Sequence, residues 1–382
     1  MRIAFLNSWP EARHQGSGTA VSIANLARGL TVRGHQVVLL SPRRVRSADR
    51  PLPLLLQRLQ FNRSVGRRIR ESGPLDLVVG FDLDGFLWAT REHERASRNG
   101  RPSPPFALWL KGVAADEARF ARGSDSLLLS FVARLESMNA RAADRVLVPS
   151  RYSAGVASSS YGLPPHVLRV VPEAIDLEEW SLPAANGRGL NGSKASPGTR
   201  LPSPADPLEI LSVARQYQRK DTATLLRALP VLERSGIPAR LRVIGGGPEL
   251  SRLEKLARRL DLSRPVEFLG PVEDSAQVRA AYRGAHLFCL PSLQEGFGLV
   301  FLEAMASGLP IVAARAGATP EVVGNGAGGR LFAPGDHEEL GHTLVELARN
   351  PELRERMTQA GYRRVQKFSL SHLADRFVEA SL

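Results

Sequence analysis

Two glutamates eight positions apart, Glu295 and Glu303, enclose the residues whose types and spacing point most directly to chemistry. Between them, a turn with Gly296 and Gly298 leads into an apolar helix expected from about Phe297. The amides at the start of such a helix attract a phosphate or another anion. Carboxylates bind hydroxyl groups well but repel phosphates. The pattern therefore indicates a ligand with an anionic centre and hydroxylated ends. The plainer alternative is that Glu295 only favours the helix start and that Glu303 is a solvated helix residue.

The elements that must position these glutamates follow a repeating rhythm of apolar strands and helices. An apolar strand over 285–290 ends just before Ser292, which places the turn at the carboxyl end of a strand, where α/β folds bind ligands. Two series of such runs, the second beginning at 208, alternate with helical stretches. We therefore predict an α/β protein with two doubly wound, Rossmann-like domains.

The expected domain boundaries follow from composition. Residues 1–177 form the first domain, and residues 178–207 form a flexible linker rich in Gly, Ser, Asn and Pro. Residues 208–366 form the second domain, and residues 367–382 form a final helix. A chain of 382 residues suits two domains of ordinary size.

Composition and charge narrow the functional classes. The single cysteine, Cys289, lies in an apolar strand, so a disulfide framework is excluded. The N-terminus does not read as a secretory signal, and no apolar run reaches membrane-spanning length, so we expect a cytoplasmic protein. Residues 1–172 hold 25 Lys and Arg against 13 Asp and Glu, whereas the remaining residues hold 26 against 25. The basic first half points to an anionic partner, either phospholipid or nucleic acid.

The segment 43–70 concentrates this charge, with nine arginines among apolar residues. One interpretation is a basic amphipathic helix lying on an anionic membrane surface, which would place the protein at the inner membrane face. The other is a helix that covers the sheet and has a solvated basic face. The segment has one aromatic residue, Phe61, and no recognisable nucleic-acid-binding motif, so no nucleic acid is expected as a partner.

Further motifs follow the expected strands. The loop Gly16-Ser17-Gly18 opens the first helix but is not a dinucleotide fingerprint, because Val21 holds the third glycine position. Two cations, Arg215 and Lys220, follow the first strand of the second domain. Further along the chain, a glycine-rich turn with Gly245 and Gly246 ends the next strand, and Asp82-Leu83-Asp84 follows the third strand of the first domain. The aspartate pair is similar to a metal-binding D-x-D motif. We reject a metal there and expect Asp82 to bind acceptor hydroxyls instead.

Together these motifs resemble glycosyltransferase family 4, the retaining sugar-nucleotide enzymes with the GT-B fold and an E-x7-E motif. Other segments that carry the resemblance are 143–150, 213–215, 244–249, 304–313 and 317–321. The resemblance implies two Rossmann-like domains facing each other across a cleft. The first would lie on the acceptor side, the second would bind the donor, and the final helix would cross back to the first.

The resemblance also implies roles for individual residues. Glu303 would hold the ribose hydroxyls and Glu295 the transferred sugar. The catalytic candidates are Glu295, Arg215 and Lys220. The donor-binding candidates are Ser292, Gly296, Phe297, Gly298, Leu299, Val300, Glu303, Gly245 and Gly246. The acceptor-side candidates are Gly16, Ser17, Gly18, Asp82, Lys111, Asp116 and Glu173.

The acceptor side departs from the family pattern at two places. Many members carry a histidine after the fourth strand, whereas residues 107–117 contain none, so Lys111, Asp116 and Glu117 are the candidates there. The family's Asn-Gly before an aspartate appears here as Glu173-Ala174 before Asp176. We expect a metal-independent transferase that needs no cofactor, uses a nucleotide-sugar donor and glycosylates a hydroxyl of a glycan or lipid-linked acceptor. The alternatives are a non-catalytic nucleotide-sugar binding subunit and a basic module that binds membrane or nucleic acid.

Overall fold

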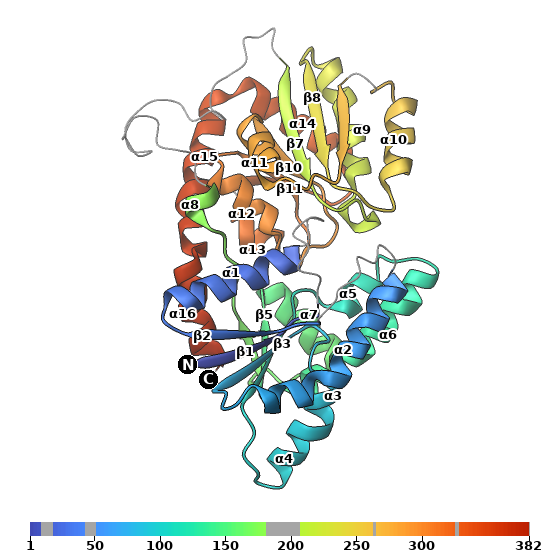
Figure 1. Cartoon of the computed structure of the whole chain (residues 1–382). Helices are drawn as coiled ribbons and strands as arrows, with labels where there is room; N and C mark the ends of the chain where they lie inside the picture. The colour runs from blue at the N-terminus through green and yellow to red at the C-terminus, as the bar shows by residue number, and fades with distance from the viewer. Residues whose placement is uncertain (9–17, 43–50, 181–206, 263–264, 325–327, 382) are drawn as a thin grey trace. The chain divides into compact units, whose positions relative to one another are not determined.

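A computed structural model describes residues 1–8, 18–42, 51–180, 207–262, 265–324 and 328–381 (Figure 1). The chain divides into two compact units. Of the described residues, the first unit holds those up to Ala174 together with those from Leu370 onward, and the second unit holds those between Ile175 and Ser369.

The first unit is built on a six-stranded parallel sheet with the order β2-β1-β3-β4-β5-β6. Its strands are β1 (Arg2–Leu6), β2 (Gln36–Leu40), β3 (Leu77–Phe81), β4 (Phe106–Trp109), β5 (Arg145–Val148) and β6 (Leu168–Val170). Its helices are α1 (Gly18–Val32), α2 (Pro51–Glu71), α3 (Phe86–Trp88), α4 (Glu94–Arg98), α5 (Ala114–Ala118), α6 (Ser124–Ala142), α7 (Arg151–Tyr161) and α16 (Leu370–Ser381), with a π-helical turn η2 at Ala89–His93.

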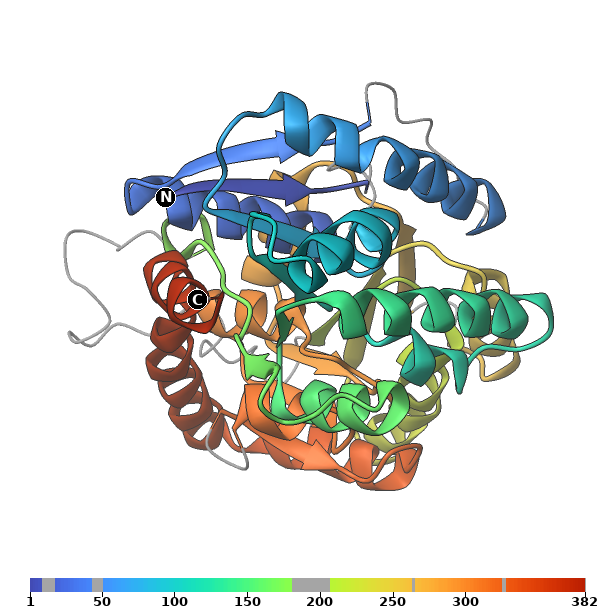
Figure 2. The ribbon, with the colours of Figure 1, turned by 90° about the horizontal axis from the view of Figure 1, so that it is seen from below.

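Both faces of this sheet are covered, as the almost continuous apolar sequence of its central strands requires. Ile3 and Phe5 of β1 pack on the face that α1 and α16 cover, and Phe377 of α16 stacks on Trp109 with ring centroids 5.8 Å apart. Ala4 and Leu6 point to the opposite face and pack with α2, α6 and α7. Figures 1 and 2 show α1 lying beside α16.

The second unit holds another six-stranded parallel sheet, with the order β12-β11-β10-β7-β8-β9. Its strands are β7 (Leu208–Val213), β8 (Ala239–Ile244), β9 (Val266–Gly270), β10 (Leu287–Leu290), β11 (Ile311–Ala314) and β12 (Gly329–Phe332). Its helices are α8 (Leu177–Trp180), α9 (Thr222–Arg234), α10 (Leu250–Arg259), α11 (Ser275–Arg283), α12 (Leu299–Ala306), α13 (Thr319–Val323), α14 (His337–Arg349) and α15 (Pro351–Val365), with 3-10 turns η5 (Gln218–Lys220) and η6 (Gln366–Phe368).

The strand order of the second sheet fixes where a ligand site belongs. The sequence runs from β7 outward through β8 and β9, then returns to the other side of β7 at β10. Strands β7 and β10 pair in parallel, with Leu287 opposite Ile210 and Phe288 opposite Leu211. Their carboxyl ends therefore meet at the point where the winding direction reverses, which is where doubly wound sheets bind ligands.

The predicted fold class of two doubly wound α/β domains is confirmed by the two parallel sheets. Two expected boundaries differ in detail. The linker was expected from 178, but Leu177–Trp180 form helix α8, and the ring of Trp180 packs edge-on against Tyr282 at 5.3 Å. The rest of the expected linker, 181–206, lies outside the described residues. The helix expected from about Phe297 begins at Leu299 instead, because Gly298 adopts a left-handed conformation that α12 cannot continue.

Candidate active site

The two loops at the carboxyl ends of β7 and β10 are joined to each other. The Leu293 N–H donates to the Arg219 carbonyl oxygen at 2.8 Å. Lys220 Nζ lies 2.5 Å from Glu295 Oε1, and both side chains are largely buried. The structure thus brings together Lys220 and Glu295, two catalytic candidates 75 positions apart in the sequence.

The charge of Glu295 is set by its surroundings. Burial alone would raise the pKa of this carboxyl group, but the charges of Lys220 and Arg219 outweigh burial and hold its pKa below the ordinary value. Glu295 is therefore an ionised, buried carboxylate at neutral pH, as a group that accepts hydrogen bonds from sugar hydroxyls needs to be.

A cluster of cations lies on the β7 loop. The guanidinium carbons of Arg215 and Arg219 lie 5.3 Å and 5.6 Å from the ring centroid of the exposed Tyr217. Lys220, which pairs with Glu295, lies on the same loop and adds a third cation to it. Sequence reasoning selected Arg215 and Lys220 but missed Arg219. Its position next to Lys220 was the available signal.

The glycine-rich turn after β8 supports this loop. The Gln216 N–H donates to the Gly246 carbonyl oxygen at 2.9 Å. Gly245 has a φ of 120°, and a Cβ there would lie 2.0 Å from the Ala214 carbonyl oxygen. Gly245 and Gly246 therefore hold the backbone that carries Arg215, and any side chain at Gly245 would displace it.

The turn before α12 has a buried part and a part that presents backbone donors. Phe297 is buried, with its ring 5.8 Å from that of Phe368, so its side chain belongs to the core. Gly298 caps the helix at φ 89°. The N–H groups of Leu299 and Val300, in the first turn of α12, have no partner within the helix. They give this helix start the partial positive charge that favours an anion.

Glu295 is also held from a third loop. The Ala318 N–H donates to the Glu295 carbonyl oxygen at 2.9 Å. Gly317 has a φ of 56°, and a Cβ there would lie 2.5 Å from that same oxygen. Ser292, another donor-binding candidate, is buried between β10 and the turn. The loop after β11 therefore fixes the backbone of Glu295.

Glu303 lies in α12 beside a tyrosine that the sequence did not single out. The Tyr282 hydroxyl donates to Glu303 Oε2 at 2.7 Å. Burial raises the pKa of Glu303 to about 7, although the tyrosine hydrogen bond acts in the opposite direction. The carboxyl group of Glu303 therefore titrates near neutral pH, which the plain reading of a solvated helix residue does not explain.

In the first unit, the structure joins two acceptor-side candidates in a buried ion pair. Lys111 Nζ lies 3.0 Å from Glu173 Oε1 and 2.6 Å from Ser22 Oγ. The ammonium group also lies over the ring of Trp109, 3.2 Å from its centroid. Burial lowers the pKa of Lys111, while Glu173 opposes that shift. The pair links α1 to the loops after β4 and β6.

The two aspartates after β3 are held by different protein groups. Asp82 has a φ of 56° and accepts the Lys111 N–H at 2.8 Å, and burial raises its pKa to about 6. Asp84 is buried and accepts the N–H and the hydroxyl of Ser8, at 2.8 Å and 2.5 Å. The two carboxylates thus hold different loops: Asp82 contacts the loop after β4, and Asp84 contacts the residue that follows β1 by two positions.

The remaining candidates are placed as follows. Asp116 is buried and accepts the Tyr152 hydroxyl at 2.6 Å and Arg119 at 3.1 Å. Gly18 is the exposed first residue of α1. Gly16 and Ser17 lie outside the described residues.

The described residues hold neither a candidate metal cluster nor a candidate membrane span. No group of three or more His, Cys, Asp or Glu side chains is arranged to hold a metal ion in this part of the chain. None of its helices combines the length and apolar character that a membrane span needs.

Comparisons with known proteins agree with the fold. Residues 16–179 match the family model described as Glycosyltransferase Family 4, and residues 199–364 match the model described as Glycosyl transferases group 1. With two doubly wound sheets and this arrangement of loops, the chain has the GT-B architecture of nucleotide-sugar-dependent transferases. It belongs to glycosyltransferase family 4.

Relatives extend over most of the chain. The D-inositol 3-phosphate glycosyltransferase of Streptomyces coelicolor is 34% identical over 61% of this chain and 54% of its own length. The phosphatidyl-myo-inositol mannosyltransferase of Mycobacterium leprae is 29% identical over 94% of this chain and 91% of its own length. The chain spans about half the length of the first curated relatives it matches.

Solved structures share the fold at low identity. The sucrose-phosphate synthase of Thermosynechococcus elongatus has a TM-score of 0.77 at 19% identity and covers 99% of this chain and 97% of its own. The Anabaena HepE protein, solved in complex with UDP and glucose, has a TM-score of 0.70 at 19% identity and covers 99% and 98%.

Proposed function

We propose that this protein transfers a sugar from a nucleotide diphosphate-sugar to a hydroxyl acceptor, with retention at the anomeric carbon and without a metal ion. One observation carries the proposal. At the reversal point of the second sheet, the ionised Glu295 and the cations Lys220, Arg215 and Arg219 lie on two joined loops, and α12 begins in the same turn as Glu295.

Different residues of this site bind different parts of the donor. The α12 amides of Leu299 and Val300, with Arg215 and Lys220, bind the diphosphate. Glu303 accepts hydrogen bonds from the ribose hydroxyls, and Glu295 accepts them from the transferred sugar. The two carboxylates stand away from the phosphates, because like charges repel.

The protein accelerates the reaction mainly by charge stabilisation and positioning. As the bond between the sugar and the diphosphate breaks, negative charge grows on the leaving phosphate oxygen. Arg215 and Lys220 stabilise that charge in the role that a metal ion has in other transferases. The acceptor oxygen bonds to the anomeric carbon on the same face, and its proton passes to the leaving phosphate oxygen. No side-chain base is required.

The acceptor is a hydroxyl group of a glycan or of a lipid-linked molecule. Relatives named for inositol 3-phosphate and for phosphatidyl-myo-inositol make polyols that carry a phosphate the first class to test. A lipid-linked acceptor would bring the protein to an anionic membrane surface as a peripheral protein, which suits the basic first half of the chain.

The test is transfer by the purified chain. UDP- and GDP-sugars are offered with inositol phosphate, phosphatidylinositol and glycan acceptors, with and without EDTA, and the anomeric configuration of the product is read by NMR. We expect a product of retained configuration, formed equally in EDTA and at least a hundredfold more slowly by Glu295→Gln. Glu267→Gln, an exposed carboxylate on β9, is the control and should behave as wild type.

Two results would contradict the proposal. Inverted products would refute the retaining mechanism. Nucleotide binding with neither transfer nor donor hydrolysis across the panel would favour the non-catalytic binding subunit.

A further inference from the structure

Helix α6 presents large apolar side chains to solvent along one face. Leu127, Phe131 and Met138 are 76%, 48% and 44% exposed. Together with Arg134 and Arg141, they follow one another at spacings of four, three, four and three residues, which places all five on one stripe of the helix. We call this stripe the α6 face.

The α6 face is not the side that stabilises the fold. The other side of the helix supplies the buried residues Leu135 and Ala140, which pack in the first unit. Asn139 on that side donates to the carbonyl oxygens of Asp82 and Asp84, at 3.0 Å and 3.2 Å. Helix α6 is therefore anchored by its inner side, and its apolar outer side has no function in the packing of this unit.

Helix α2 belongs to the segment 43–70, for which the sequence suggested a membrane-bound helix. In contrast to α6, most of its large apolar side chains face the core. Its apolar residues Leu55, Phe61, Val65 and Ile69 are buried in the core, while Leu56 is its exposed large apolar side chain. The sheet-covering interpretation of the described part of this segment is thus the better one, and residues 43–50 lie outside the described residues.

The charge around the α6 face is strongly one-sided. Over the helices α5 to α7, from 114 to 161, the exposed charged side chains are Arg119, Arg122, Arg134, Arg141, Arg151, Asp125 and Asp144. Asp144 precedes β5 and accepts hydrogen bonds from the Phe106 N–H and His93, so Asp125 is the exposed acid on the helices themselves. A field of this sign attracts an anionic surface.

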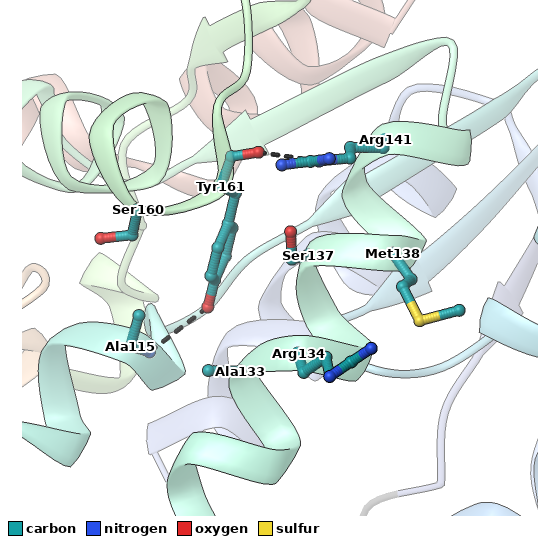
Figure 3. A pocket seen from close by; sticks show the side chains of 8 residues that line it. All are labelled: Ala115, Ala133, Arg134, Ser137, Met138, Arg141, Ser160 and Tyr161. Carbon is teal, nitrogen blue, oxygen red and sulfur yellow. Dashed lines mark hydrogen bonds between the residues drawn. The ribbon is translucent and has the colours of Figure 1, made fainter.

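A hollow of about 410 Å³ opens on the same face (Figure 3). Its lining residues are Ala115, Ala133, Arg134, Ser137, Met138, Arg141, Ser160 and Tyr161. Figure 3 shows Ser137 between Arg134 and Arg141 along α6, with Tyr161 across from them. A lining with two arginines and no acidic residue suits an anion such as a phosphate, and the volume lies in the range of sites for small molecules and headgroups.

We propose that the α6 face docks this protein onto an anionic phospholipid bilayer. Leu127, Phe131 and Met138 enter the boundary between headgroups and acyl chains. Arg134 and Arg141 hold a lipid phosphate at the hollow. The proposal names the surface that would contact the membrane in the transfer to a lipid-linked acceptor. Only the reason for docking rests on that proposed function; the docking itself does not.

The test is flotation of the full chain with vesicles of phosphatidylcholine alone or with about one third phosphatidylserine. We expect binding to the anionic vesicles, loss of binding in high salt, and none to the neutral vesicles. The pair Leu127→Ser with Phe131→Ser should weaken binding about tenfold or more. The matched control is Val32→Ser with Leu56→Ser, which removes side chains that are 76% and 58% exposed on α1 and α2.

A second pair tests the charges. Arg134→Gln with Arg141→Gln should weaken vesicle binding by a similar factor, whereas Arg63→Gln with Arg67→Gln, exposed on α2, should have a clearly smaller effect. Because the Arg141 Nε–H donates to the Tyr161 carbonyl oxygen, the melting temperature of each variant is measured alongside.

Several outcomes would overturn the proposal. These are no binding to anionic vesicles, equal losses from the α6 pairs and their controls, or an α6 pair that changes the size of the protein in solution instead of its vesicle binding. The last outcome would show that a second copy of the chain covers this face. Nucleotide binding is measured separately, so failure of the docking surface is distinguishable from failure of the proposed transferase function.

Discussion

At the scale of single residues, the buried ion pair of Lys220 and Glu295 should contribute to stability as well as to function. Removing one partner of a buried ion pair leaves the other charge unpaired, which costs about 3 kcal/mol. We therefore predict that Lys220→Met lowers the free energy of unfolding by about 3 kcal/mol. The double variant Lys220→Met with Glu295→Gln should recover part of that loss in a denaturant titration. Equal losses in the single and double variants would contradict the pairing.

The same pair predicts a dependence on pH with a definite sign. Because the pKa of folded Glu295 is held below its ordinary value of 4.5, the pair contributes stability above that pH and loses it as the pH falls through the folded pKa. The difference in unfolding free energy between wild type and Lys220→Met should be full at pH 7 and shrink as the pH falls below that ordinary value. A difference that does not change with pH would refute this assignment.

Glu303 predicts that nucleotide affinity depends on pH near neutrality. Its pKa of about 7 means that the free protein carries a mostly protonated Glu303 at pH 6 and a mostly ionised one at pH 8. Since an ionised acceptor binds hydroxyls more strongly, nucleotide affinity should rise about fivefold over this range. Titration calorimetry checks the rise. Glu303→Gln should abolish it, and Tyr282→Phe should move its midpoint to higher pH because that hydroxyl favours the ionised form.

How far these residues were predictable depends on where their partners lie. Glu295, Glu303, Arg215 and Lys220 follow from a local motif and from resemblance. The tyrosine beside Glu303 did not, because Tyr282 lies on α11, 21 positions earlier, and meets the carboxylate only through the tertiary fold. The burial of Lys111 against Glu173 was hidden for the same reason, since 62 positions separate them.

At the scale of elements, the β7 loop holds the side chain of Glu295 and the loop after β11 holds its backbone, and a glycine makes the second contact possible. Gly317→Ala would place a Cβ 2.5 Å from the Glu295 carbonyl oxygen at a φ of 56°. We predict a loss of about 2 kcal/mol in unfolding free energy, together with a large fall in transfer rate. Gly335→Ala is the control, because Gly335 has a φ of 80° but nothing within 4 Å of the added Cβ. It should lose only about 1 kcal/mol and keep its activity.

If both glycine variants lost activity equally, the Gly317 contact would have no special function. The sequence indicated the loop 317–321 only through resemblance, and its contact with Glu295 required the structure. The start of α12 was likewise misplaced by two residues, because apolar periodicity does not show the left-handed φ of Gly298. Periodicity also fails for α6, where apolar side chains face solvent and the sequence alone could not separate an inner from an outer stripe.

At the scale of the whole molecule, the two parallel sheets were predictable because each central strand is an apolar run bounded by turn residues and followed by a helix. The order of the strands was not, since it depends on which edges pair. The expected linker began slightly too early, because the helix Leu177–Trp180 is short and was grouped with the polar stretch that follows it. The final helix, Leu370–Ser381, packs on the first sheet through Leu373 and Phe377, where the resemblance had placed it.

The central claim is a metal-independent nucleotide diphosphate site on the second unit, and thermal unfolding with a panel of nucleotide diphosphates in EDTA tests it most directly. We predict that one nucleotide, at about a hundredfold over its Kd, raises the melting temperature by about 4 °C. EDTA should leave that shift unchanged, Arg215→Ala should reduce it, and Arg240→Ala, a cation on β8 of the same unit, should not. A shift that vanishes in EDTA, or no shift with any nucleotide, would contradict the account.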